Sequence, residues 1–111
     1  MALNDFDPRY AEFRKLFNAK KFFEAHEVLE LLWRETKGPE RDFYQGLIQI
    51  AAVFVHIQKQ TPEGGRKLLE KASAKLGKFE PRFMGLEISK LLSQTARALE
   101  SEADFPKIRI R

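Results

Sequence analysis

The sequence of 111 residues contains no cysteine. Disulfide bonds, thiolate metal ligands and cysteine nucleophiles are therefore excluded, and a reducing cytoplasm is the natural environment of such a chain. The sequence also lacks any apolar run of the ~20 residues that a membrane-spanning helix needs. Its first residues include acidic side chains where an export signal would carry basic ones. We expect a cytoplasmic protein that is neither exported nor inserted into a membrane.

No internal repeat, low-complexity tract or linker interrupts the sequence, which indicates a single domain over residues 1–111. A content of 43% hydrophobic and 32% charged residues is typical of a folded globular protein. The net charge of +4 admits an anionic partner. However, the basic stripe Lys67, Lys71, Lys75 and Lys78 is accompanied by neither a recognition-helix pattern nor an aromatic platform. We interpret it as a solvated helix face and expect no binding to nucleic acid.

Hydrophobic periodicity predicts an all-α fold without a sheet, a compact bundle of about five helices. The helices are expected over about 8–18, 22–35, 40–60, 62–77 and 84–103, with a turn at 80–83. The third is apolar on most of its surface, so we expect it to be central and largely buried. Phe23 and Leu31 lie off the main apolar stripe of the second helix, which indicates that it is covered on more than one side. Residues 107–111 alternate with the strand period, which would allow pairing with a sheet edge or contact with a partner, although terminal segments are more often loosely held.

Polar side chains form two sets on the second and third helices. On the third helix, Asp42, Gln45, Gln49 and His56 share one face because the helical repeat is 3.6 residues. On the second helix, His26 and Glu30 are one turn apart. If the two faces meet, the carboxylates can pair with arginine while the amides complete the hydrogen bonding. The candidate polar site comprises eight residues: His26, Glu27, Glu30, Arg34, Arg41, Gln45, Gln49 and His56.

Two sequence strings carry a resemblance to a known family. The strings Phe22–Glu30 (FFEAHEVLE) and Gln45–Gln49 (QGLIQ) together resemble the signature of domain of unknown function 309, a family of small all-helical proteins of bacteria and plastids. The resemblance continues through Trp33, His56 and Pro62 and covers about residues 17–100, leaving an N-terminal and a C-terminal extension. It implies a helical fold, with no established activity.

Three interpretations of the polar site are open. In the first, it is a satisfied hydrogen-bond network that fixes helix register, since an unpaired buried polar group costs ~1–3 kcal/mol. In the second, it binds a small polar ligand beside the small residues Gly46 and Ala52, or a divalent metal through His26, Glu30 and His56. The sequence requires no cofactor. An enzyme with His26 or His56 as general base is a variant of this interpretation, but no nucleophile can be identified.

In the third interpretation, the polar stripe forms a groove for a partner's helix or an isologous homodimer face. A binding site predicts that replacing His26 or Glu30 changes ligand binding without changing assembly, whereas an interface predicts a changed assembly. Our leading hypothesis is a cytoplasmic helical binding protein with a site for a small polar ligand or metal. The alternative is an interaction or homodimerisation module whose polar cluster is structural.

Overall fold

A computed structural model describes residues 6–101 and 105–110 of the chain. Within these residues, five α-helices, a short 3-10 helix and a two-stranded hairpin follow one another. The elements are α1 (Pro8–Asn18), α2 (Phe22–Glu35), α3 (Pro39–Gln58), α4 (Pro62–Leu76), η2 (Gly77–Phe79), β1 (Arg82–Phe83), β2 (Leu86–Glu87) and α5 (Ile88–Ser101). The predicted helical bundle is confirmed. None of the described helices is long and apolar enough to span a membrane.

Prolines and a capping carboxylate fix the helix starts. The Asp7 side chain accepts a hydrogen bond from the Arg9 amide (2.9 Å), immediately ahead of Pro8 at the start of α1. Pro39 and Pro62 begin α3 and α4, where the missing N–H would have no partner within the helix. Gly38, just before α3, has a φ of 83°, a left-handed conformation that favours glycine.

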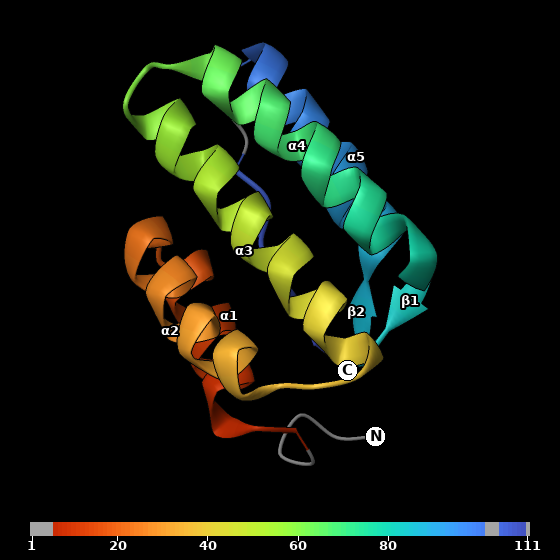
Figure 1. Ribbon diagram of the computed structural model, residues 1–111. Helices are drawn as coiled ribbons and strands as arrows, with labels where there is room; N and C mark the ends of the chain where they lie inside the picture. Colours follow the sequence, from red (N-terminus) through yellow and green to blue (C-terminus); the bar gives the residue numbers. More distant parts are fainter. Residues whose placement is uncertain (1–5, 102–104, 111) are drawn as a thin grey trace.

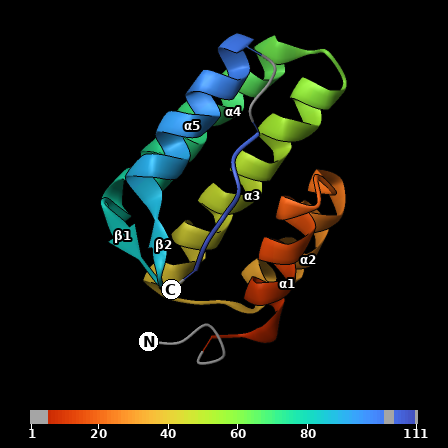
Figure 2. The same ribbon diagram turned by 180° about the vertical axis from the view of Figure 1, so that it is seen from behind.

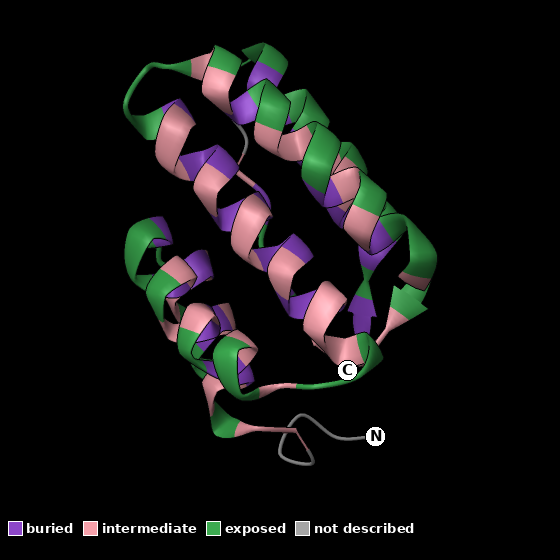
Figure 3. Cartoon of the chain, in the orientation of Figure 1, coloured by how far each residue is buried: buried purple, intermediate pink, exposed green. Residues whose placement is uncertain are grey.

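The third helix is the central element. It lies between α2 and α4, while α1 and α5 lie behind (Figure 1). On the reverse side, residues 105–110 run along α3 between α5 and α1 (Figure 2). The central position that we expect from the sequence is confirmed. One face of α3, turned to the viewer in Figure 3, nevertheless remains only half-buried.

Aromatic rings fill the centre of the bundle. The rings of Phe22 and Phe54 stack with centroids 4.9 Å apart, which joins the start of α2 to the end of α3. Phe17 of α1 meets both rings edge-on, at 5.0 and 5.4 Å. Phe105 of the C-terminal segment does the same at 5.7 and 5.5 Å. Four segments of the chain are thus joined by one cluster, and such ring pairs add ~0.5–1.5 kcal/mol each beyond their buried area.

A β-hairpin replaces the start of the predicted fifth helix. Its two antiparallel pairs are Arg82 with Glu87 and Phe83 with Leu86. The turn consists of Met84 and Gly85, whose φ angles are 48° and 76°. Two successive positive φ angles suit a tight hairpin turn and cannot continue a right-handed helix. The prediction of a chain without any sheet was therefore wrong here, and α5 begins at Ile88 instead of Met84.

The C-terminal segment 105–110 is held by the rest of the fold. The side-chain amide of Asn18 accepts a hydrogen bond from the Ile108 N–H (2.7 Å) and donates one to the Ile108 carbonyl (3.0 Å). The Ile108 side chain is 2% exposed. Ile110 forms an antiparallel bridge to Leu86, so of the interpretations left open by the sequence the segment takes the pairing with a sheet edge and is not loosely held. The predicted end of the last helix, at 102–103, and Arg111 lie outside the described residues.

Candidate functional site on the outer face of α2

The second helix carries a line of interacting polar side chains on its outer side. Glu30 is the shared partner: its Oε2 lies 3.7 Å from Nε2 of His26, and its Oε1 accepts a 2.9 Å hydrogen bond from Arg34. Each partner is one helical turn from Glu30, the spacing at which side chains of a helix meet. The pairing of Glu30 with Arg34 that the sequence admits is therefore present. The carboxylate is one-third exposed, so its charge is available to a molecule that approaches α2.

Two large apolar side chains flank this polar line. Phe23 and Leu31 are 56% and 52% exposed, and they are the exposed large hydrophobic residues of the described chain. The Phe23 ring stacks on the His26 imidazole, with centroids 6.0 Å apart. A shallow hollow of about 180 Å³ is lined by Glu27, Glu30, Leu31 and Arg34. We call this surface the α2 outer face and define it by Phe23, His26, Glu27, Glu30, Leu31 and Arg34.

One nitrogen at this surface lacks a partner. Nδ1 of His26 is buried and makes no hydrogen bond with any of the described residues. Its other ring nitrogen faces Glu30, so the imidazole is oriented by a carboxylate on one side only. A buried polar atom without a partner costs ~1–3 kcal/mol. The α2 outer face thus combines exposed apolar area with an unmet hydrogen-bonding group.

Arg41 contributes to a different contact. Its guanidinium lies over the Trp33 ring, 4.2 Å from the centroid, in a cation–π arrangement. It also donates hydrogen bonds to the carbonyls of Trp33 (3.1 Å) and Thr36 (3.3 Å). These carbonyls belong to the end of α2, which has no further turn to satisfy them. Arg41 therefore joins the end of α2 to the start of α3 and makes no contact with a carboxylate within the described chain.

The polar stripe of α3 is directed toward α4. At one end of the stripe, Asp42 pairs with Lys75 (3.6 Å) and Lys78. At the other end, Nδ1 of His56 lies 2.8 Å from the Thr61 hydroxyl. The His56 ring also fills the space beside Gly64, where a Cβ atom would lie 2.5 Å from the ring.

Gln45 and Gln49 lie between these two ends of the stripe and are half-buried. Oε1 of Gln49 is buried without a partner among the described residues. One end of the stripe contacts α4 and the other contacts the turn before α4. Gln45 and Gln49 share the helix face of these two ends, so they lie on the side of α3 nearer to α4.

The polar interactions of the eight candidate residues fall into three groups. The α2 line holds His26, Glu27, Glu30 and Arg34, the α2–α3 junction holds Arg41, and the α3 stripe holds Gln45, Gln49 and His56. No hydrogen bond or ion pair joins the α2 line to the α3 stripe among the described residues. His56 packs beside Gly64 at the start of α4. The described part of the chain contains no group of three or more His, Asp or Glu residues placed to hold a metal ion.

Asp42 allows a test of the contact between α3 and α4. The hydrogen bond from Lys78 is the main cause that lowers the pKa of the Asp42 carboxyl below its ordinary 3.8. A carboxyl whose folded pKa is lowered stabilises the fold above the unfolded value and loses this effect as the pH falls through the folded value. We expect Asp42→Asn to be less stable than the wild type near neutral pH, with the difference disappearing as the pH falls well below 3.8. Urea denaturation followed by circular dichroism at several pH values measures this difference.

The matched control is Glu63→Gln. Glu63 is an exposed carboxylate in the first turn of α4 and takes part in no ion pair of the described chain. A stability difference for Asp42→Asn that stays constant across the acid range would show that the ion pair is not its cause.

The fold places the chain in the class of small helical-bundle domains. Comparison with known proteins identifies the family of this domain. The sequence profile of the family "Domain of unknown function (DUF309)" matches residues 10–68, more than half of the chain. The crystal structure of a conserved hypothetical protein from Thermus thermophilus is similar, with a TM-score of 0.72 and 35% sequence identity. That similarity covers 82% of this chain and 95% of the Thermus chain. The protein belongs to the DUF309 family, and all eight candidate residues lie within the matched region.

Two curated relatives are longer proteins. The uncharacterised protein YpuF of Bacillus subtilis is 32% identical over 62 residues, which are 54% of this chain and 36% of YpuF. An uncharacterised protein of Aquifex aeolicus is 26% identical over 76 residues, 68% of this chain and 23% of that protein. The chain thus spans well under half the length of these relatives. Their descriptions name no activity, so the similarity establishes family and fold alone.

The sequence indicated the polar residues of α2, but not that exposed apolar side chains surround them. It predicted that Phe23 and Leu31 would be covered, because both lie off the main apolar stripe. In the described chain both are more than half exposed. The useful signal was already in the sequence: two large apolar residues on the polar side of an amphipathic helix.

Proposed function

We propose that the protein is an interaction module that binds a polypeptide partner on the α2 outer face. The observation that carries the proposal is the coincidence of Phe23 and Leu31 with the polar line of His26, Glu30 and Arg34 on one helix. Exposed apolar anchors beside charged and hydrogen-bonding groups are typical of protein interfaces. In the isolated chain this apolar area stays in contact with water and adds nothing to stability, whereas a partner would bury it.

The charge of α2 indicates the chemistry of the partner. The helix carries four glutamates against one arginine, a net charge of −3, in a chain whose net charge is +4. Glu24, Glu27 and Glu30 accompany the two apolar anchors. A complementary partner therefore presents basic residues around an apolar stripe, as a basic amphipathic helix does. We propose such a helix as the occupant.

Two other occupants are less well supported. A second copy that packed its own α2 against this face would bring two acidic surfaces together, which electrostatic repulsion opposes. The basic stripe on α4 offers charge but no exposed large apolar side chain to cover Phe23 and Leu31. For a small ligand, the hollow of about 180 Å³ is formed by one helix and is smaller than the ~300–1,000 Å³ of ordinary ligand pockets.

The proposal is tested with a synthetic helical peptide that has lysines around a leucine stripe, labelled with fluorescein. We expect fluorescence anisotropy to detect binding to the wild-type protein. A peptide with glutamates in place of the lysines should not bind. Exchanging Glu27 for lysine should weaken binding about tenfold or more, equivalent to ~1.4 kcal/mol or more. The matched control is Glu63→Lys, the same charge change at an exposed position on α4.

Several results would contradict the proposal. These are equal binding of the basic and acidic peptides, equal weakening by Glu27→Lys and Glu63→Lys, or no binding of the basic peptide at ~1 mM. Analytical ultracentrifugation of the protein alone tests whether a second copy of the chain occupies the α2 outer face. A dimer that dissociates on replacing Phe23 and Leu31 with serine would assign the α2 outer face to a second copy.

A further inference from the structure

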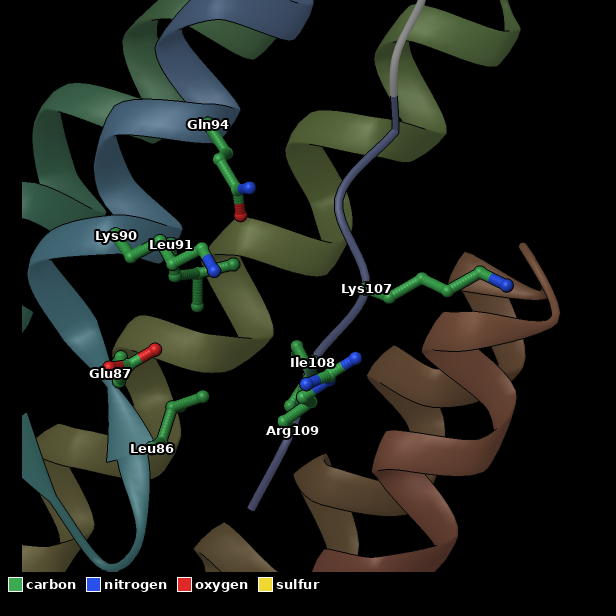
Figure 4. A pocket seen from close by; sticks show the side chains of 8 residues that line it. All are labelled: Leu86, Glu87, Lys90, Leu91, Gln94, Lys107, Ile108 and Arg109. Carbon is green, nitrogen blue, oxygen red and sulfur yellow. The ribbon is translucent and has the colours of Figure 1, made fainter. Parts of the chain in front are cut away.

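A second surface feature lies far from the residues of the α2 outer face. A hollow of about 290 Å³ opens between the start of α5 and the C-terminal segment. Figure 4 shows it with the side chains that line it, which come from β2, α5 and residues 107–109. Segments that are far apart in the sequence therefore build the hollow jointly. This distinguishes it from the depression on α2, which one helix forms alone.

The floor of the hollow is firmly packed, although most of its exposed lining is polar. Leu86, Leu91 and Ile108 line it and are each only 2–3% exposed. Ile108 is held from the other side by the two hydrogen bonds of Asn18. Leu86 is held by its bridge to Ile110. These three side chains expose little surface, so a ligand would rest on a floor whose position the fold already determines and would meet mainly polar groups, and binding requires little reorganisation.

The rim of the hollow is positively charged. It carries Lys90, Lys107 and Arg109 against the single carboxylate of Glu87. None of these four side chains forms an ion pair or a side-chain hydrogen bond with the described residues. Figure 4 shows the Lys90 and Gln94 side chains reaching from α5 into the space beside the C-terminal segment, whereas Lys107 extends away from α5. The charge excess at the rim is +2, half of the +4 of the whole chain.

We propose that this hollow binds a small organic anion, a carboxylate or a phosphate monoester. Lys90 and Arg109 would attract the anionic group, the Gln94 amide would donate a hydrogen bond to it, and the rest of the ligand would lie over the floor formed by Leu86, Leu91 and Ile108. Hydrogen bonds from charged donors to an anion are about twice as strong as neutral ones. The volume is close to the lower limit of ordinary ligand pockets, ~300 Å³, so the ligand is of metabolite size.

The proposal is independent of the interaction surface on α2, because the two share no residue. Its test uses phenyl phosphate and phenylacetate as probes and 2-phenylethanol as their neutral counterpart. We expect isothermal titration calorimetry of the full chain to detect binding of either or both anions and much weaker binding of the alcohol. The methyl resonances of Leu86, Leu91 and Ile108 should shift in NMR spectra as the bound anion is titrated.

Substitutions at the rim distinguish a site from general attraction to a basic protein. We expect Lys90→Gln to weaken binding of the anion about tenfold or more, as losing a hydrogen bond to a charged group implies. Lys71→Gln, a matched change at an exposed lysine on α4, should leave the affinity unchanged. Equal effects of the two substitutions, equal binding of the neutral alcohol, or inorganic phosphate binding as tightly as phenyl phosphate would each overturn the proposal. Absence of binding by both anions would overturn it as well.

Discussion

Replacing Phe22 with alanine is expected to lower the free energy of unfolding by ~3–5 kcal/mol, the range for removing a buried phenylalanine from a core. The Phe22 side chain is 1% exposed and contacts the rings of Phe17, Phe54 and Phe105. Its loss leaves a cavity at the point where α1, α2, α3 and the C-terminal segment meet. Because a domain of this size is stable by only ~5–15 kcal/mol, the variant should lose a large part of its stability.

The adjacent residue supplies the control. Phe23 is the same amino acid one position along the same helix, but it is 56% exposed. We expect Phe23→Ala to change the free energy of unfolding by less than ~1 kcal/mol, because surface changes away from special features have small effects. Urea denaturation followed by circular dichroism measures both variants. Similar losses for the two would show that the aromatic cluster does not hold the bundle together.

Replacing Gly46 with valine is expected to cost ~3 kcal/mol, at the upper end of the usual range for overpacking a core. A Cβ atom at Gly46 would lie 2.5 Å from Cγ and 2.7 Å from Cδ2 of Leu76, closer than real Cβ contacts allow. Leu76 is fully buried in α4, so other core residues surround the side chain that would have to move. The absence of a side chain at Gly46 is therefore what permits α3 and α4 to approach so closely.

A second substitution separates this clash from a change in helix propensity. If the contact with Leu76 is the cause, Gly46→Val should cost less in a Leu76→Ala background, with a coupling energy of ~0.5–3 kcal/mol between the two sites. Gly77→Val is the control, because a Cβ there would meet only Glu80 Oε1 at 3.8 Å. Thermal unfolding of the four proteins of the cycle gives the comparison. Additive effects would mean that Leu76 does not limit the space at Gly46.

The helices were predictable from the sequence where local signals agree. Pro8 and Pro62 mark helix starts, and periodicity supplied the lengths; the third helix begins at Pro39, one residue before the predicted start. The bounds of α1 and α2 were predicted as they are observed. The hairpin was not, because strands of two residues are too short to display an alternating pattern and Met84 gives no hint of a positive φ. Gly85 alone was an ambiguous signal, since glycine also occurs in helix starts.

The candidate site was predictable in part. Periodicity placed His26, Glu30 and Arg34 on one line of α2, and their contacts follow from that spacing. The orientation of the α3 stripe was not predictable. When apolar residues cover most of a helix, the sequence does not show which face is turned toward which neighbour. A difference of about one residue in helix rotation, ~100°, decides between facing α2 and facing α4. The contacts of Asp42 with Lys75 and Lys78 place that end of the stripe beside α4 and η2.

The anchoring of Ile108 by Asn18 also affects the order in which the protein can fold during synthesis. The two residues are 90 positions apart, whereas α1, α2 and α3 are connected by short turns. Chains are made from the N-terminus at ~5–20 residues per second, so these three helices can meet while the rest is still absent. Phe105, which covers Phe22 and Phe54, arrives among the last residues of the described chain. The aromatic centre is therefore uncovered on one side until residues 105–110 have left the ribosome.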